Sequence, residues 1–196
     1  MSSIRVSSHP LVAHKISILR NKNTKPKQVR ELMREIGQLL GYEATADLPT
    51  KSTSTLESPL APYAGTELAT TVGLVPILRA GLIFVDVLQD MIPTARVLHL
   101  GIFRERISLQ PVEYYNKLPA EPNVEQILVL EPMIATGGTA VAAASILKEW
   151  GIKSKIKLIT ICASRQGLDY LMKHHPDVEV FVGDAGDRLY DTPHLN

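Results

Sequence analysis

The sequence predicts an α/β protein, in which a mostly parallel sheet is flanked by helices. From residue 67 onward, continuous apolar segments alternate with segments of helical periodicity. Continuous apolar strands are typical of a parallel sheet that helices cover on both faces. The 196 residues, 45% of them hydrophobic, are enough for one domain with a sizeable core. We therefore expect a single domain over residues 1–196, with an N-terminal helical arm (1–50) and a core (67–196).

The arm is predicted to hold two helices, over residues 9–23 and 24–47, because apolar residues recur there at helical spacing. Thr24 is expected to cap the second helix, since a threonine hydroxyl can bond the first free amides of a helix. Residues 48–67 are rich in serine, threonine and proline, and we expect a connection with some extended character.

The core is predicted to alternate between strands and helices. Strands are expected over residues 68–81, 95–103, 124–132, 155–163 and 177–186, and helices over 82–92, 139–151 and 165–175. Residues 109–119 suggest an exposed hairpin arm with two adjacent aromatics, Tyr114 and Tyr115. Because ligands bind beyond the carboxyl ends of parallel strands, the turns that begin near Arg79, Glu131 and Gly183 are the candidate site.

Charge and cysteine content exclude several classes of protein. Lysine plus arginine number 21 and aspartate plus glutamate 20, so no global basic field favours a nucleic acid or an anionic membrane. A local basic excess in the arm is interpreted as the solvated faces of two helices: Lys15, Arg20, Lys22, Lys25, Lys27, Arg30 and Arg34. The single cysteine, Cys162, lies in an apolar run and excludes an intrachain disulfide. With no signal-peptide core and no apolar run of roughly 18 residues, we expect a cytoplasmic protein.

The turn EPMIATGGT, residues 131–139, has the composition of an anion cradle. Gly137 and Gly138 leave backbone amides open to a phosphate, and Thr136 and Thr139 add hydroxyl donors. The helix that follows directs its N-terminal amides at the same place. The carboxylate of Glu131 suits a ligand that also carries hydroxyl groups, such as a ribose. Neither the Walker spacing nor the dinucleotide-binding spacing of glycines is present.

Two arginines and a glycine-rich turn follow other predicted strands. Arg79 and Arg104 lie at strand ends, where a guanidinium can bind a diphosphate through several donors. In GDAGDR, the small residues let a flat ligand approach the backbone. Asp184 and Asp187 in that turn can hold water around Mg²⁺, which prefers oxygen ligands.

Segments along nearly the whole chain resemble the uracil phosphoribosyltransferase family: HPLVAHKISILRNKNT, YEAT, VPILRAGL, PVEYYNKLP, EPMIATGGT and GDAGDR, in that order. The resemblance implies the type I phosphoribosyltransferase fold with a β-hairpin arm. It also implies the reaction of uracil with 5-phosphoribosyl 1-diphosphate (PRPP) to give UMP and diphosphate, with Mg²⁺ as cofactor.

The same resemblance implies the site residues. PRPP is expected at Arg79, Arg104, Asp184 and the turn Glu131, Pro132, Met133, Ile134, Ala135, Thr136, Gly137, Gly138 and Thr139. Uracil is expected at Gly183, Asp184 and Ala185, largely through the backbone. Arg104 and Asp184 are the expected catalytic residues, and Mg²⁺ is expected to bind through substrate and water with no direct protein ligand. Glu131 stands where the family usually has aspartate.

The chain departs from the family pattern just before Gly183. The family usually has more than a dozen further residues there, which form a hood over uracil and end in a tyrosine-isoleucine-x-proline-glycine-leucine stretch. Here HPDVEVF runs almost directly into VGDAGDR. Two alternatives therefore stay open beside an active uracil phosphoribosyltransferase: an inactive or weakly active donor-binding paralogue, and a phosphoribosyltransferase for another base. The resemblance further implies a homodimer or higher homo-oligomer, and in some relatives GTP is an effector.

Overall fold

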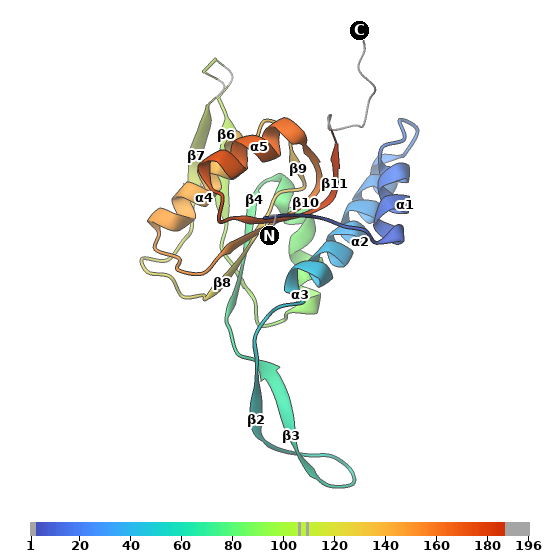
Figure 1. The fold of residues 1–196 in the computed structure, drawn as a ribbon, viewed down its shortest axis with the longest axis vertical. Coiled ribbons are helices and arrows are strands. Elements are labelled where there is room, and N and C mark those ends of the chain that lie inside the picture. Colours follow the sequence, from blue (N-terminus) through green and yellow to red (C-terminus); the bar gives the residue numbers. More distant parts are fainter. Residues whose placement is uncertain (1–2, 106, 109, 187–196) are drawn as a thin grey trace.

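A nine-stranded sheet forms the centre of the computed structural model, which describes residues 3–105, 107–108 and 110–186 (Figure 1). Its strands, in spatial order, are β1 (Ile4–Val6), β11 (Glu179–Gly186), β10 (Ile156–Ser164), β8 (Gln126–Leu130), β4 (Val72–Leu78), β6 (Leu100–Arg104) and β7 (Pro111–Asn116). Two short strands lie off this path, β5 (Arg96–Val97) beside β4 and β9 (Met133–Ile134) beside β10. All pairs are parallel except β6 and β7, which form an antiparallel hairpin. The predicted α/β class and mostly parallel sheet are confirmed.

Helices cover both faces of the sheet, as the continuous apolar strands predict. Helices α1 (Pro10–Leu19), α2 (Pro26–Thr45) and α3 (Val85–Met91) pack on one face together with a 3-10 turn, η1 (Ala80–Phe84). Helices α4 (Gly138–Glu149) and α5 (Arg165–His174) pack on the other face. Alternate residues of one strand enter the two cores: Leu128 faces α2, whereas Val129 faces α4. Within the described residues, no helix is long and apolar enough to cross a membrane.

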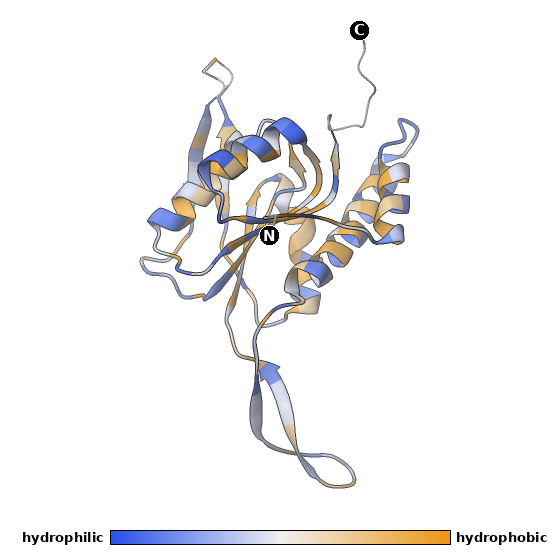
Figure 2. Ribbon diagram, in the orientation of Figure 1, coloured by the Kyte–Doolittle hydropathy of each residue, from blue (hydrophilic) through white to orange (hydrophobic). Residues whose placement is uncertain are grey.

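A second hairpin projects away from the body (Figure 1). Strands β2 (Thr50–Glu57) and β3 (Pro62–Leu68) pair with each other and not with the main sheet. The sequence predicts only a connection with extended character over 48–67. The regular strands were missed because nearly all of their side chains are exposed, so no buried face imposes a period of two. Figure 2 shows few hydrophobic residues along these strands, in contrast to the central sheet.

Four local predictions need correction. Thr24 does not cap α2: Lys25 precedes that helix without a side-chain bond, and the Thr24 hydroxyl donates to the carbonyl of Ile18 at the end of α1. The predicted strand 95–103 is divided into β5 and β6, and the predicted helix 82–92 begins with the 3-10 turn η1. The strand β1 was not predicted, because three residues are too few to show a periodic pattern.

Candidate active site

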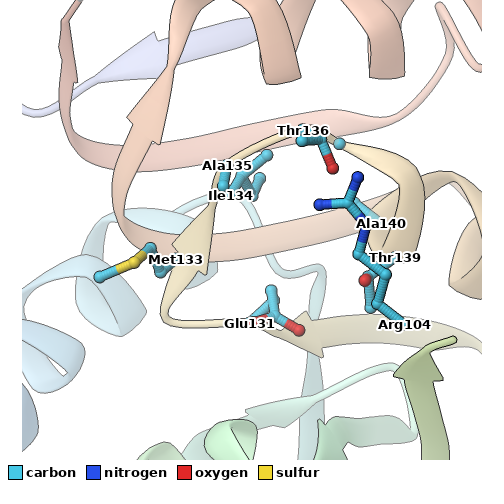
Figure 3. A pocket seen from close by; sticks show the side chains of 9 residues that line it. Arg104, Glu131, Met133, Ile134, Ala135, Thr136, Thr139 and Ala140 are labelled. Atoms are coloured by element: carbon cyan, nitrogen blue, oxygen red, sulfur yellow. The ribbon is translucent and has the colours of Figure 1, made fainter. Parts of the chain in front are cut away.

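A cavity of about 150 Å³ lies at the carboxyl end of β8, where the turn 131–137 leads into α4. Its lining combines the predicted phosphate turn with one of the two predicted arginines: Arg104, Glu131, Met133, Ile134, Ala135, Thr136, Gly137, Thr139 and Ala140. In Figure 3 the guanidinium of Arg104 points across the cavity toward the loop that carries Thr136. The structure thus brings Arg104 and the turn together, because the sheet order places β6 and β8 on either side of β4.

The turn is held in place from behind by the first turn of α5. The Ser164 hydroxyl donates to the carbonyl of Ala135 and also accepts the amide of Gly167, at 3.0 Å, which caps α5. Gly137 adopts a left-handed conformation, with φ of 80°, that side chains rarely tolerate. A β-carbon on Gly137 would also lie 2.4 Å from the carbonyl oxygen of Gly167. These contacts order the turn before any ligand arrives.

Gly138 serves a different purpose from Gly137. A β-carbon built on Gly138 would meet no atom closer than the Thr136 hydroxyl, at 4.0 Å. The protein's own packing therefore does not require glycine at this position. Because Gly138 is the first residue of α4, its missing side chain leaves the N-terminal amides of the helix open to an anion.

Glu131 is the acidic residue of the cavity, and burial raises the pKa of its carboxyl to about 7. The amide of Met133 donates to this carboxyl and acts in the opposite direction, with a smaller effect. Neutral Glu131 does not repel an incoming phosphate, whereas hydroxyl groups that donate to the carboxyl favour its charged form. The carboxyl can therefore change its protonation near neutral pH when a ribose-bearing ligand binds.

Arg79 lies outside this cavity, at the end of β4 that faces the β6–β7 hairpin. It lines an open groove together with Leu78, Ile102, Phe103 and Tyr114. The peptide bond between Leu78 and Arg79 is cis. Tyr114 packs against Phe103, with 5.9 Å between the ring centres, so this tyrosine belongs to a packed hairpin. The groove places a second guanidinium at the same edge of the sheet as Arg104.

The GDAG turn forms the end of β11. Asp184 faces the arm, whereas Ala185 lies on the other face of the sheet, beside Leu168 of α5. Among the described residues, Asp184 does not line the Arg104 cavity; its Oδ2 lies 2.5 Å from Nη1 of Arg20, at the end of α1. The space beside the α-carbon of Gly183 is filled by Ile16 and Val12 of α1. A flat ligand could therefore meet Gly183 only through its backbone edge. Asp187 lies outside the described residues.

Arg20 is the site residue that sequence reasoning missed. It was interpreted as part of a solvated helix face, yet its side chain is only 17% exposed. Basic residues on amphipathic helices usually face water, and no local pattern indicates that one of them meets an acid on the last strand. The segment RNKNT at the end of the first predicted helix was the only available signal.

The family model for uracil phosphoribosyltransferase matches residues 6–192 of this chain. A uracil phosphoribosyltransferase from Roseiflexus castenholzii is 50% identical, over 98% of this chain and 100% of its own length. The enzyme of the same name from Brevibacillus brevis is 44% identical, with the same coverage. The Roseiflexus match extends over 209 residues, 13 more than this chain contains, so that relative carries residues with no counterpart here.

Solved structures agree with the sequence comparison. A protein from Aquifex aeolicus superposes with a TM-score of 0.87 at 32% identity, over 94% of this chain and 88% of its own. Adenine phosphoribosyltransferase from Trypanosoma brucei superposes with a TM-score of 0.59 over 95% of this chain and 84% of its own, at 11% identity, a likeness of fold alone. The observed sheet is therefore the type I phosphoribosyltransferase fold, and the chain belongs to the uracil phosphoribosyltransferase family.

Proposed function

We propose that this chain transfers the 5-phosphoribosyl group of PRPP to uracil and so forms UMP and diphosphate. The observation that carries the proposal is the cavity that brings Arg104 together with the two threonines of the phosphate turn. It lies at the start of α4, where Gly138 carries no side chain that would cover the helix amides. An anion cradle beside a guanidinium and a carboxyl suits a sugar that bears phosphate groups at both ends.

In this proposal each group has a role set by its place. The amides and hydroxyls of residues 136–139 bind the 5-phosphate, and the Glu131 carboxyl accepts from the ribose hydroxyls. Negative charge grows on the diphosphate as the bond to C1 of the ribose breaks, and Arg104 and Arg79 stabilise that charge. The β6–β7 hairpin, with Tyr114, covers the site and excludes water. No protein nucleophile is required, because the base attacks C1 itself.

The donor set suits Mg²⁺ held mainly by the substrate. The acids near the strand ends, Glu131 and Asp184, supply oxygen atoms that can bind the waters of a magnesium ion. When bound, Mg²⁺ supplies positive charge to the departing diphosphate. Arg79 and Arg104 are the positive charges that the protein itself supplies to the departing diphosphate.

A second candidate is a donor-binding relative with weak activity or with another base as acceptor. One observation favours it: β11 pairs with β10 in one constant register from Glu179 to Gly186, so no hood is inserted in the strand before Gly183. A base pocket that lacks one hydrogen-bonding wall loses discrimination between bases. The donor half of the site is common to both candidates.

The experiment combines purified protein, labelled uracil, PRPP and Mg²⁺, and measures labelled UMP. Arg104→Ala is expected to abolish turnover. The matched control is Arg96→Ala on β5, whose guanidinium donates to the carbonyl of Asn123. Equal loss in both variants, or full activity in Arg104→Ala, would contradict the proposed role of the cavity.

Assembly, effector and location are three further parts of the proposal. A homodimer or higher homo-oligomer is supported by apolar side chains exposed on the β2–β3 hairpin, among them Leu56 and Tyr63. A cytoplasmic location is supported by the single, buried cysteine. A GTP effector rests on the family resemblance alone. Sedimentation, cell fractionation and rates measured with added GTP test these three points.

A further inference from the structure

Arg20 and Asp184 form an ion pair that joins the N-terminal arm to the end of β11. Nη1 of Arg20 lies 2.5 Å from Oδ2 of Asp184, with side-chain exposures of 17% and 36%. Arg20 ends α1, and its backbone amide bonds the carbonyl of Ile16 at 3.0 Å. The guanidinium therefore extends from a residue whose backbone is fixed at the end of a helix.

The sheet register explains why these two residues meet. Met133, Cys162 and Asp184 lie side by side across β9, β10 and β11. Side chains in one row of a parallel sheet point to the same face, which here is the face that α1 and α2 cover. Neighbouring strands lie about 4.8 Å apart, so β9, which leads into the phosphate turn, and β11, which holds Asp184, are about 10 Å apart. Asp184 thus stands close to the reaction site, with its carboxylate turned to the arm.

An apolar cavity of about 190 Å³ lies between the arm and this row of residues. Arg20 is its charged member, and the others are apolar or nearly so: Leu19, Val29, Met33, Pro132, Met133, Ile161 and Cys162. A carboxylate beside apolar surface is costly unless a partner compensates it. Without Arg20, the Asp184 side chain would be expected to rotate away toward water.

The arm is docked by packing as well as by this ion pair. A β-carbon on Gly183 would lie 2.8 Å from Cδ1 of Ile16 and 3.3 Å from Cγ1 of Val12, so α1 rests directly on β11. Both apolar residues are almost fully buried. Apolar contact therefore holds α1 in place independently of the charge on Arg20, which leaves the guanidinium to set the orientation of the carboxylate.

We propose that Arg20 is a positioning residue, which fixes the carboxylate of Asp184 and makes the N-terminal arm part of the reaction site. This inference rests on the proposed function, in which Asp184 acts on PRPP through magnesium-bound water. Arg20 itself contacts neither uracil nor PRPP. It acts only through Asp184, and that restriction makes the inference testable.

The test is a double-mutant cycle on the full chain, with kcat and KM measured for UMP formation. We compare Arg20→Gln, Asp184→Asn and the double variant, with Arg20→Lys as the conservative replacement. Arg20→Gln is expected to lower kcat roughly tenfold, with little change in KM for uracil. The double variant is expected to be no slower than Asp184→Asn alone, and Arg20→Lys is expected to recover part of the rate. Lys15→Gln, which breaks an exposed ion pair with Glu35 in the same arm, is the control.

The sole cysteine gives a second readout that does not depend on activity. Cys162 lines the same cavity as Arg20 and is 5% exposed, so its rate of reaction with a thiol reagent reports whether the arm stays docked. Arg20→Gln is expected to react as slowly as the wild-type protein. Fast labelling of Arg20→Gln, or multiplicative losses in the cycle, would overturn the positioning role. A wild-type protein without turnover would overturn the proposed function and this inference with it, whereas an active enzyme with multiplicative losses overturns the inference alone.

Discussion

Gly137 and Gly167 touch through backbone atoms, so that the phosphate turn rests on the first turn of α5. A β-carbon on Gly137 would lie 2.4 Å from the carbonyl oxygen of Gly167 in α5. A β-carbon on Gly167 would lie 2.5 Å from the carbonyl oxygen of Ala135 in the phosphate turn. The turn is therefore rigid on its protein side. On its open side, Gly138 leaves free space.

This difference predicts opposite outcomes for two adjacent substitutions. Gly137→Ala is expected to lower the free energy of unfolding by at least about 1–2 kcal/mol, because φ is positive there and the carbonyl cannot yield. Gly138→Ala is expected to leave stability unchanged or to raise it slightly, since alanine favours a helix. It should nevertheless weaken PRPP binding by about 1.5–3 kcal/mol, the value of hydrogen bonds to a charged group. Thermal unfolding and calorimetry measure the two effects, and an unstable Gly138→Ala would contradict the assignment.

Gly183→Ala is predicted to displace the arm. The added methyl would meet the carbonyl oxygen of Ile161 at 2.8 Å on one side and Ile16 on the other. Overpacking of this kind costs about 1–3 kcal/mol. Because α1 must move, Cys162 should react with a thiol reagent faster than in the wild-type protein. An unchanged labelling rate would show that α1 does not depend on this contact.

Glu131 is predicted to make stability fall as the pH rises. Its pKa is raised from 4.5 to about 7 in the folded protein, so the folded state holds a proton that the unfolded state has lost between these values. Stability present below pH 4.5 is therefore lost progressively up to about pH 7, by at most about 3 kcal/mol. Glu131→Gln removes this loss. Chemical denaturation of both proteins at pH 5 and pH 8 measures it, and parallel changes in the two would contradict the assignment.

His175 is predicted to make stability fall as the pH falls, in the opposite direction to Glu131. Burial, and then the charge of Lys148, lower its pKa below 6.5. The Lys148 ammonium lies 3.0 Å from Nδ1, and a lysine only donates, so the ring proton is on Nε2, 3.1 Å from the Ser145 hydroxyl. Stability is present above pH 6.5 and is lost as the pH falls toward the lowered pKa, because the unfolded state binds the proton first.

His175→Asn should remove this loss, since its amide oxygen can still accept from Lys148. Lys148 also lowers the pKa of Asp177, so the stability that Asp177 contributes is lost only at a pH more acid than the range measured. Unfolding curves between pH 7.5 and 5.5 make the comparison. Because Glu131 titrates in the same range with the opposite sign, the difference between the two proteins is the readout, and parallel changes in the wild-type and His175→Asn proteins would refute the prediction.

The parts of the fold that the sequence predicts are those in which burial dictates the pattern. Strands β4, β8, β10 and β11 are mostly apolar because helices cover both faces of the sheet. The glycines and threonines that suit a phosphate are consecutive in the turn after β8, so the sequence alone displays them. The hairpin β2–β3 buries almost nothing and so leaves no pattern. The pair of Arg20 and Asp184 depends on a docking of α1 against β11 that no local spacing indicates.

The most direct test of the account is the initial rate of UMP formation by the wild-type protein with PRPP and Mg²⁺, compared with the rates for cytosine and hypoxanthine as acceptors. Turnover is expected to saturate with uracil and to be much slower with the other two bases. Bound PRPP in calorimetry without any UMP would contradict it, and would identify a protein that keeps the donor site of its family without the acceptor.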